Sequence, residues 1–261
     1  MASKVNGQQI AESVDFDWQA DKTSVVLKDF NYGADRLTSD HPDVAKLREI
    51  NDFLRDHHWQ QRGPVRIIYK SSPLAGGRVY TRCQSLPSKF RLAMRIDGRP
   101  VVELDYKSNH LMMLIAMTGQ PLLPDPYQLV ADMAQVTRNK VKEFVTRGLG
   151  ASSETSARQS LGRKKMNRVE FDRIRHALDE AFPGIPLFQG FGIMLQSLEG
   201  QIALDIMVAG VRSGIVVIPI HDSFITTADN EQWLHDEMHK QWLIHTGSEL
   251  RQMVRIEKKQ G

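Results

Sequence analysis

Cysteine is almost absent from this chain of 261 residues, because Cys83 is the only one. One thiol cannot build an intramolecular disulfide framework or a cysteine-ligated zinc finger, and this usage is typical of a reducing compartment. Long apolar runs are missing too, since HLMMLIAM at 110–117 is much shorter than the roughly 20 residues that cross a bilayer. With no apolar signal segment in the sequence, we expect a cytoplasmic protein and no membrane contact.

A large net charge is also lacking, because 34 basic residues nearly balance 31 acidic ones. The charge is distributed unevenly, however, since residues 138–175 contain eleven Lys and Arg and only four acidic residues. The densest part of this basic segment includes Arg163, Lys164 and Lys165. It predicts contacts with phosphate groups, and the alternative is a solvated, charged helix face.

Hydrophobic periodicity predicts a mixture of helices and strands. We expect helices at 39–59, 106–119, 126–150, 168–182, 195–214 and 231–247, and strands at 64–72, 76–86, 99–105 and on both sides of residues 221–223. The polar residues 1–39 predict an irregular or loosely strand-like lead-in, and the Gly/Ser-rich segment 148–162 predicts a linker or a mobile loop. Together these elements indicate an α+β fold with one antiparallel sheet backed by helices and a helical insertion.

Two aspartates stand where predicted strands end. Asp105 follows VVEL, and Asp222 lies at the tip of the predicted hairpin GIVVIPIHDSFITTAD at 214–229. The apolar flanks would be buried while the acids stay at the rim of the sheet, where they can converge. Converging carboxylates without a Cys or His cluster favour Mg²⁺ or Mn²⁺, and paired ions of this kind catalyse phosphoryl transfer. The alternative is that each Asp is an ordinary turn residue.

A predicted helix, RNKVKEFVTRGLG at 138–150, supplies a third feature. Arg138, Lys142 and Thr146 recur every four residues and therefore share one face, beside an apolar stripe that can pack. Two cations on a packed helix can bind a triphosphate. The pattern alone is common and usually marks a solvent-exposed face, so it gains weight only together with the two acids.

In this order and spacing, the three segments resemble motifs of the family A DNA polymerases and the related single-subunit RNA polymerases. LDYKSNHLMMLIAMTG is similar to motif A, RNKVKEFVTRGLG to motif B, and IPIHDSF to motif C with the His-Asp-Ser of the RNA polymerases. The resemblance covers about residues 76–261. It implies an antiparallel-sheet polymerase palm backed by helices, a helical fingers insertion, and template-directed nucleotidyl transfer by a two-metal mechanism.

The resemblance also implies a role for each matching residue. Asp105, Asp222 and the Tyr106 carbonyl would bind two Mg²⁺ or Mn²⁺ ions. Arg138 and Lys142 would bind the triphosphate of the incoming nucleotide, and Lys142 would protonate the pyrophosphate leaving group. The other implied contacts are with the nucleotide, at His110, Thr146 and Gly150, and with the primer or template, at His221, Arg78, Arg163, Lys164 and Lys165.

Two departures from the family pattern concern the sugar of the incoming nucleotide. His110 and Gly150 occupy positions where the DNA polymerases have a glutamate and a tyrosine that crowd the ribose 2′ position. Gly150 has no aromatic ring to crowd the ribose 2′ position, and Thr146 lacks an aromatic stacking surface. The sequence therefore predicts tolerance of ribonucleotides and a primer-synthesising role, although His110 is larger than the glycine of the RNA polymerases and could itself act as a gate.

The resemblance also divides the chain. Residues 1–75 would be a reduced thumb or a cover for the sheet, 76–119 the first part of the palm, 120–200 the fingers, and 201–261 the second part of the palm. Since a full thumb does not fit before residue 76, we expect low processivity and an accessory protein, as in a replication enzyme of a mobile element. The other expected partners are a template, a primer and nucleoside triphosphates.

A second class of function stays open at this point. The chain could be a catalytically inactive, polymerase-derived protein that binds nucleic acid or assists replication. The presence of Asp105, Asp222, Arg138 and Lys142 favours the enzyme, because a protein that only binds nucleic acid needs neither acid. Gly150 favours the inactive protein, because it lacks the tyrosine ring of the family.

Overall fold

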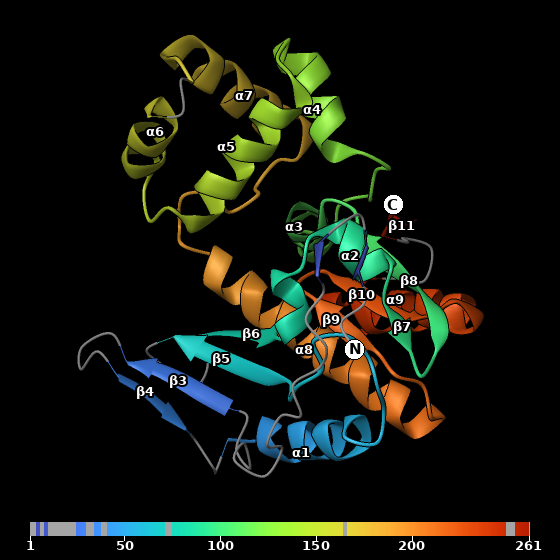
Figure 1. Ribbon diagram of the computed structural model, residues 1–261. Helices are drawn as coiled ribbons and strands as arrows, with labels where there is room; N and C mark the ends of the chain where they lie inside the picture. The colour runs from blue at the N-terminus through green and yellow to red at the C-terminus, as the bar shows by residue number, and fades with distance from the viewer. Residues whose placement is uncertain are drawn as a thin grey trace. The chain divides into compact units, whose positions relative to one another are not determined.

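The computed structural model describes residues 4–5, 8–9, 25–29, 34–37, 41–70, 75–163, 166–248 and 254–260 (Figure 1). It divides into two compact units. The sheet unit consists of Met1–Tyr106, Gln196–Trp242 and Ile256–Gly261, and the helical unit consists of Lys107–Leu195 and Leu243–Arg255. Helices and antiparallel strands occur together, which confirms the predicted α+β class.

The main sheet of the sheet unit has five strands in the order β11-β8-β10-β9, with β7 also paired to β8. Their bounds are β7 (Arg95–Ile96), β8 (Arg99–Tyr106), β9 (Ile218–Ile220), β10 (Ser223–Thr227) and β11 (Ile256–Lys258). Every pairing in this sheet is antiparallel. Strand β8 therefore lies between two strands that come from the last fifth of the chain, and its own residues face partners that are far away in sequence.

A second sheet has the order β4-β3-β5-β6. It is built from β3 (Val25–Asp29), β4 (Ala34–Leu37), β5 (Arg66–Lys70) and β6 (Gly76–Tyr80), and β1 (Lys4–Val5) pairs separately with β2 (Gln8–Gln9). Strands β3 and β5 run parallel. The prediction of one antiparallel sheet was therefore wrong, because short polar-flanked strands such as β3 and β4 carry little periodic signal. Strands β3 and β4 agree with the loosely strand-like alternative for the lead-in.

Helix α1 (Asp43–Leu54) packs against one face of the second sheet. Its apolar residues Val44, Leu47, Ile50 and Leu54 are buried. The Tyr69 hydroxyl on β5 donates a hydrogen bond to the Asp43 carboxylate, and Gln201 of α8 (Gly192–Ser213) donates to the same carboxylate. Because side chains alternate along a strand, the residues of β5 next to Tyr69 project to the opposite face, where they are half-buried.

Helix α9 (Glu231–Thr246) covers the Tyr106 side of the main sheet. The Tyr106 hydroxyl donates a hydrogen bond of 2.6 Å to the Met238 carbonyl, and the Tyr106 ring meets Phe224 of β10 edge-on at 6.1 Å. Leu234, Met238 and Trp242 of α9 are fully buried. A short helix, α2 (Ser88–Leu92), and the 3-10 turns η1 (Arg82–Ser85) and η2 (Ala228–Asn230) complete the sheet unit.

The helical unit contains α3 (Asn109–Met117), α4 (Pro126–Ala134), α5 (Arg138–Gly150), α6 (Glu154–Gly162) and α7 (Arg168–Ala181). Its core includes a cluster of three rings, in which Phe144 lies 4.8 Å from Phe171 and 5.8 Å from Phe188. The ring cluster joins α5 and α7 to the segment that follows α7, so α5 is fixed by packing.

Two predictions about these helices were wrong. The single helix predicted at 126–150 is two, because Gln135 adopts a left-handed conformation (φ 50°) and ends α4. The predicted linker at 148–162 is largely α6. The Ser153 hydroxyl caps α6 by accepting from the Ser156 amide, and Ala157 and Leu161, one turn apart, are buried. A cap and two small or apolar residues at helical spacing outweighed the Gly/Ser composition.

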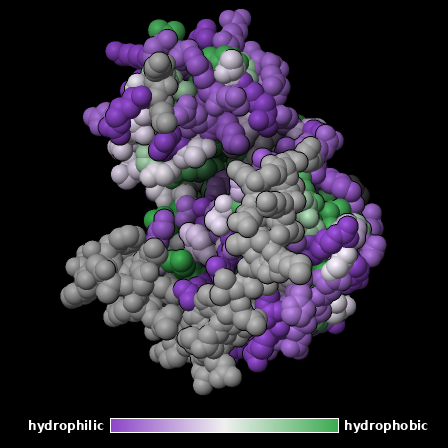
Figure 2. All heavy atoms as spheres, viewed as in Figure 1, coloured by the Kyte–Doolittle hydropathy of each residue, from purple (hydrophilic) through white to green (hydrophobic). Residues whose placement is uncertain are grey.

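The coloured part of the surface in Figure 2 is mostly hydrophilic, with small hydrophobic areas between the polar ones. Large apolar side chains that are exposed, such as Val169 and Ile244, are few. Among the helices that the structure describes, none is both long enough and apolar enough to cross a membrane.

Gly200 allows α8 to approach the edge strand β6, and this contact gives the first testable prediction. A Cβ atom at Gly200 would lie 1.8 Å from the Gly77 carbonyl oxygen, so Gly200→Ala forces the helix and the strand apart. We expect the free energy of unfolding of the variant to fall by about 3 kcal/mol. Urea denaturation followed by circular dichroism measures this change.

Gly150 provides the matched control, because a Cβ atom there would meet nothing within 4 Å. Gly150→Ala should keep the free energy of unfolding within about 0.5 kcal/mol of the parent protein. Equal stability of Gly200→Ala and Gly150→Ala would contradict the close approach of α8 to β6.

Candidate active site

Asp105 and Asp222 lie next to each other at one end of the main sheet. Asp105 on β8 stands directly opposite Ser223, the first residue of β10. Asp222 precedes Ser223, and its carbonyl accepts a hydrogen bond of 3.2 Å from the amide of Tyr106. The two aspartates are therefore one residue apart in register on adjacent strands, which corresponds to a Cα separation of roughly 6 Å.

The turn between β9 and β10 places Asp222 at a hairpin tip. Ile220 pairs with Ser223, so only His221 and Asp222 form the loop. His221 has φ 58°, a left-handed conformation that tight two-residue hairpins require and that His adopts seldom. The Ser223 hydroxyl oxygen lies 3.0 Å from the Ile220 carbonyl oxygen, across the turn. The predicted hairpin, with its acid at the tip, is present.

Tyr106 contributes through its backbone. Its side chain is anchored in the core on the α9 side, where burial first and the charge of Glu237 second raise the pKa of its phenol well above the ordinary value. The amide of Tyr106 points toward Asp222. In an antiparallel strand the N–H and C=O of one residue point to the same side, so the Tyr106 carbonyl also faces the Asp222 strand.

A buried carboxylate, Glu103, lies two residues before Asp105 on the same face of β8. It is 0 % exposed. Arg91 of α2 binds both of its oxygens, at 2.9 and 2.8 Å, while Lys259 lies at 2.8 Å and the Ser223 hydroxyl donates at 2.9 Å. Burial raises the pKa of the Glu103 carboxyl, but the bonds from Arg91 and Lys259 outweigh burial and lower it overall.

Lys259 extends this cluster to the aspartates. Its ammonium lies 3.5 Å from Asp105 Oδ1 and 3.3 Å from the Ser223 hydroxyl. Glu257 on β11 stands directly opposite Asp105. Lys259 thus offsets part of the repulsion among the carboxylates, and the cluster Arg91–Glu103–Lys259–Ser223 joins α2, β8, β10 and the end of β11.

The residues at this edge fit a hard divalent cation. Mg²⁺ is commonly bound through one or two carboxylates, with water and substrate phosphates as its other ligands. Asp105 and Asp222 supply two carboxylates and the Tyr106 carbonyl a third oxygen. Within the described ranges no three His, Cys, Asp or Glu side chains form a group that could enclose a metal by themselves, so ligands from a substrate would have to complete the coordination.

His221 lies near residues of β6 and α8. Its ring meets Tyr80 of β6 edge-on at 6.4 Å. Partial burial first, and then the charge of Arg78, lower the pKa of the imidazole, while Glu199 acts in the opposite direction. Arg78 itself lies 3.3 Å from Glu199 of α8. Asp105, Tyr106, Asp222, His221 and Arg78, all predicted site residues, thus belong to the sheet unit.

The predicted triphosphate-binding residues belong to the helical unit, where they lie along one side of α5. Lys142, Thr146 and Gly150 are exposed and Arg138 is half-buried. The apolar residues Val141, Phe144 and Val145 are fully buried, as the predicted stripe requires. The Thr146 hydroxyl donates to the Lys142 carbonyl one turn earlier.

Arg138 has partners of its own. Its Nε donates to Asp125 at 2.8 Å, and its guanidinium lies 5.4 Å from the centre of the Tyr127 ring. Burial raises the pKa of the Asp125 carboxyl, but the hydrogen bond from Arg138 outweighs it and lowers the pKa overall. The ion pair uses Nε, so the two terminal NH₂ groups of Arg138 can still donate to an anion.

The other predicted residues are distributed more widely. His110 lies in the first turn of α3 and is half-buried, and Arg163 is exposed at the C-terminal end of α6. Lys164 and Lys165 lie outside the described residues. Other cations of the basic segment are described, and several pair with acids of the same segment: Lys140 with Glu170, Arg158 with Glu154 and Asp172, and Arg175 with Asp179.

Sequence analysis missed Glu103, Arg91 and Lys259. One signal was available, since Glu103 is a charged residue inside the apolar strand VVELDY, two positions before Asp105 and hence on its face. The partners of Glu103 could not be predicted from the sequence, because Arg91 lies in a short helix and Lys259 comes 156 residues later in the chain.

The buried cluster around Glu103 gives a second prediction. Glu103→Gln leaves Arg91 and Lys259 without their counter-charge, so we expect a loss of about 3–5 kcal/mol in the free energy of unfolding at neutral pH. The lowered pKa means that the carboxylate stabilises the fold above the ordinary glutamate range and that this contribution disappears as pH falls through the folded-state pKa. The difference between variant and parent should therefore shrink below about pH 4.3.

Denaturation curves measured across this pH range test the prediction, with Glu180→Gln as the control. Glu180 is exposed and lies 3.9 Å from His176 on the same helix face, so its loss should cost less than about 1 kcal/mol. A pH-independent difference for Glu103→Gln would show that its charge does not stabilise the fold.

The chain was compared with protein families, curated proteins and solved structures. No family model and no curated protein matches the sequence. The chain is similar to a solved structure, the POL domain of Pol1 from M. smegmatis in complex with DNA primer-template and dNTP, with a TM-score of 0.48 and 15 % identity. The match covers 85 % of this chain and 51 % of that chain, so this chain spans about half the length of the structure it matches.

Proposed function

We propose that this protein is a metal-dependent nucleotidyltransferase that copies a nucleic-acid template, as a minimal relative of the family A polymerases. The observation that supports the proposal most strongly is the position of Asp105 beside Asp222 across β8 and β10. These two acids are 117 residues apart in sequence, and both come from segments that resemble polymerase motifs. If each aspartate were only an ordinary turn residue, nothing would require the two to lie on adjacent strands.

In this proposal Asp105, Asp222 and the Tyr106 carbonyl bind two Mg²⁺ or Mn²⁺ ions. Ions bound there would lower the pKa of an attacking hydroxyl and neutralise charge on the leaving phosphate. Lys259 keeps Asp105 in place and lowers the repulsion between the acids. Ser223, at the position of the third acid in the DNA polymerases, is bonded to Glu103 and so supports the sheet.

On α5, Lys142 and the terminal NH₂ groups of Arg138 would bind the triphosphate. Lys142 would also donate a proton to the pyrophosphate leaving group. Asp125 holds the Arg138 side chain in one orientation, which lowers the entropy that binding would cost. His221 would contact the primer end, and Arg78 and Arg163 the primer or template. An accessory protein would compensate for weak binding of the duplex by this chain.

A second function has one observation in its favour. Lys259 lies 3.5 Å from Asp105, and an ion pair of this kind suits a protein that binds nucleic acid without a metal. In that case Asp105 serves the fold and not catalysis. The experiments below distinguish the two functions.

Removal of either acid gives the third prediction. Asp105→Asn and Asp222→Asn should each lower the rate of nucleotide incorporation by roughly a hundredfold or more, because each substitution removes one charge from the divalent-ion site. A labelled primer annealed to a defined template, with Mg²⁺ or Mn²⁺ and all nucleoside triphosphates, measures the rate. A chelator should abolish incorporation by the parent protein, and added Mn²⁺ should restore it.

Asp229→Asn is the matched control, since Asp229 lies in η2, at the opposite end of β10. Its activity should equal that of the parent protein. If the parent protein binds the template and incorporates nothing with either metal, the function without catalysis is correct. If incorporation survives Asp222→Asn, the acids have been assigned wrongly.

Sugar selection gives the fourth prediction. Gly150 leaves open space, since a Cβ atom there meets nothing within 4 Å, and the parent protein should therefore incorporate ribonucleotides with a preference for deoxyribonucleotides well below a hundredfold. Gly150→Tyr should restore a wall at this position and raise the preference roughly tenfold. Incorporation of single paired rNTPs and dNTPs by both proteins measures the preference, and Gly150→Ala controls for helix propensity. Equal preferences in the parent protein and Gly150→Tyr would show that residue 150 does not affect the choice of sugar.

A further inference from the structure

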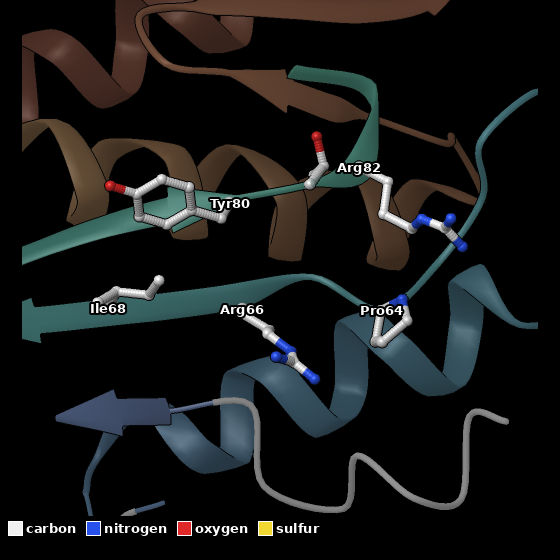
Figure 3. Close-up of a pocket in the computed structure, with 6 residues that line it drawn as sticks. Pro64, Arg66, Ile68, Tyr80 and Arg82 are labelled. Atoms are coloured by element: carbon white, nitrogen blue, oxygen red, sulfur yellow. The ribbon is translucent and has the colours of Figure 1, made fainter. Parts of the chain in front are cut away.

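The outer face of strands β5 and β6 carries an open cavity of about 460 Å³. Its lining consists of Pro64, Arg66, Ile68, Tyr80, Thr81 and Arg82, all from the sheet unit (Figure 3). Arg66 stands directly opposite Tyr80 in the strand register, so both side chains project to the same face. This is the face opposite to the one that α1 covers.

The lining combines an apolar base with flanking cations. Pro64, Ile68 and the Tyr80 ring supply apolar and aromatic surface, and Arg66 and Arg82 supply two guanidinium groups. Gly63 makes room for Arg82, because a Cβ atom at Gly63 would lie 2.8 Å from Arg82 Cδ. No carboxylate is among the described lining residues. Such a combination suits a ligand with a flat ring and an anionic backbone.

Two residues that line the cavity also contact β9 and the turn that carries Asp222. The Tyr80 ring meets His221 edge-on at 6.4 Å, and the hydroxyl of Thr81, the next residue, donates to the Pro219 carbonyl at 3.1 Å. Arg78, two residues before Tyr80 and on the same face of β6, lies within electrostatic reach of His221. A ligand chain lying on this face would therefore be led toward the acid pair.

We propose that the cavity binds a single strand of nucleic acid, with a base stacked against Tyr80 and phosphates bound by Arg66 and Arg82. The inference rests on the proposed function, since it names the surface that would lead a strand to Asp222. A duplex fits less well, because its bases are already stacked and cannot lie against Tyr80. The cavity is large enough for one nucleotide at a time, so neighbouring nucleotides would lie on the rest of the face.

The stacking part of the proposal is tested with the full chain and a fluorescein-labelled oligo(dT) of about 12 nucleotides, followed by fluorescence anisotropy. Tyr80→Leu should weaken binding about fivefold or more, with no change in the salt dependence, because no charge is lost. Tyr80→Phe keeps the ring and should bind like the parent protein. Equal binding by Tyr80→Leu and the parent protein would overturn the proposal.

The phosphate part is tested by the double variant Arg66→Gln/Arg82→Gln. Two lost phosphate contacts should reduce the slope of log affinity against log salt by about 1.4. The matched control is Arg95→Gln/Arg99→Gln, which removes two exposed arginines of the β7–β8 hairpin and should leave the slope unchanged. An equal effect of the two double variants would reduce the face to general surface charge and overturn the proposal, as would tighter binding of a blunt duplex than of the single strand.

These experiments separate the inference from the proposed function, because binding needs neither metal nor catalysis. If the parent protein incorporates nucleotides and Tyr80→Leu binds single strands normally, only the inference fails. If Tyr80→Leu loses binding and the parent protein incorporates nothing, only the proposed function fails. Thermal unfolding of each variant confirms that a loss of binding does not come from unfolding.

Discussion

The pairing of β8 with β10 is the constraint on which the candidate site depends, and a buried charge fixes its register. Glu103 has no solvent exposure and relies on Arg91, Lys259 and the Ser223 hydroxyl for hydrogen bonds. A slip by one residue would turn every side chain of the strand to the other face and leave the Glu103 carboxylate short of donors, at a cost of several kcal/mol. The register that places Asp105 beside Asp222 is therefore the one that also satisfies the Glu103 carboxylate.

Acidic side chains outnumber the basic side chains that pair with them at this edge of the sheet. Four carboxylates lie at this edge: Glu103 and Asp105 on β8, Glu257 on β11, and Asp222 in the turn before β10. Arg91 and Lys259 form ion pairs with Glu103, and Lys259 also pairs with Asp105. Arg91 binds the Glu103 carboxylate and the Leu86 carbonyl, and Lys259 lies 3.5 Å from Asp105. These carboxylates outnumber Arg91 and Lys259, which favours the binding of a further cation.

Local patterns were sufficient to predict the elements that carry the two acids. The change of period after VVELDY gave β8 followed by α3, and the hairpin around His221-Asp222-Ser223 is present with its acid at the tip. Long-range pairing was beyond reach of these patterns. The parallel contact of β3 with β5 depends on which strands meet and not on their own periodicity, and α6 was hidden because its composition resembles a linker although Ser153 caps it. The partners of Glu103 were missed for the same reason, since burial of a charge becomes visible only when distant segments come together.

The two sheets of the sheet unit are connected where the chemistry would take place. Thr81, just past β6, donates to Pro219 of β9, and Tyr80 at the end of β6 meets His221 at the start of the turn. His221 is in a left-handed conformation that costs free energy in a non-glycine residue, so neighbouring contacts must hold it there. A shift of β6 would consequently reach His221 directly and Asp222 through one peptide bond. The second sheet therefore does more than pack against α1. Tyr80 and Thr81 line its outer face and also contact the hairpin that carries Asp222.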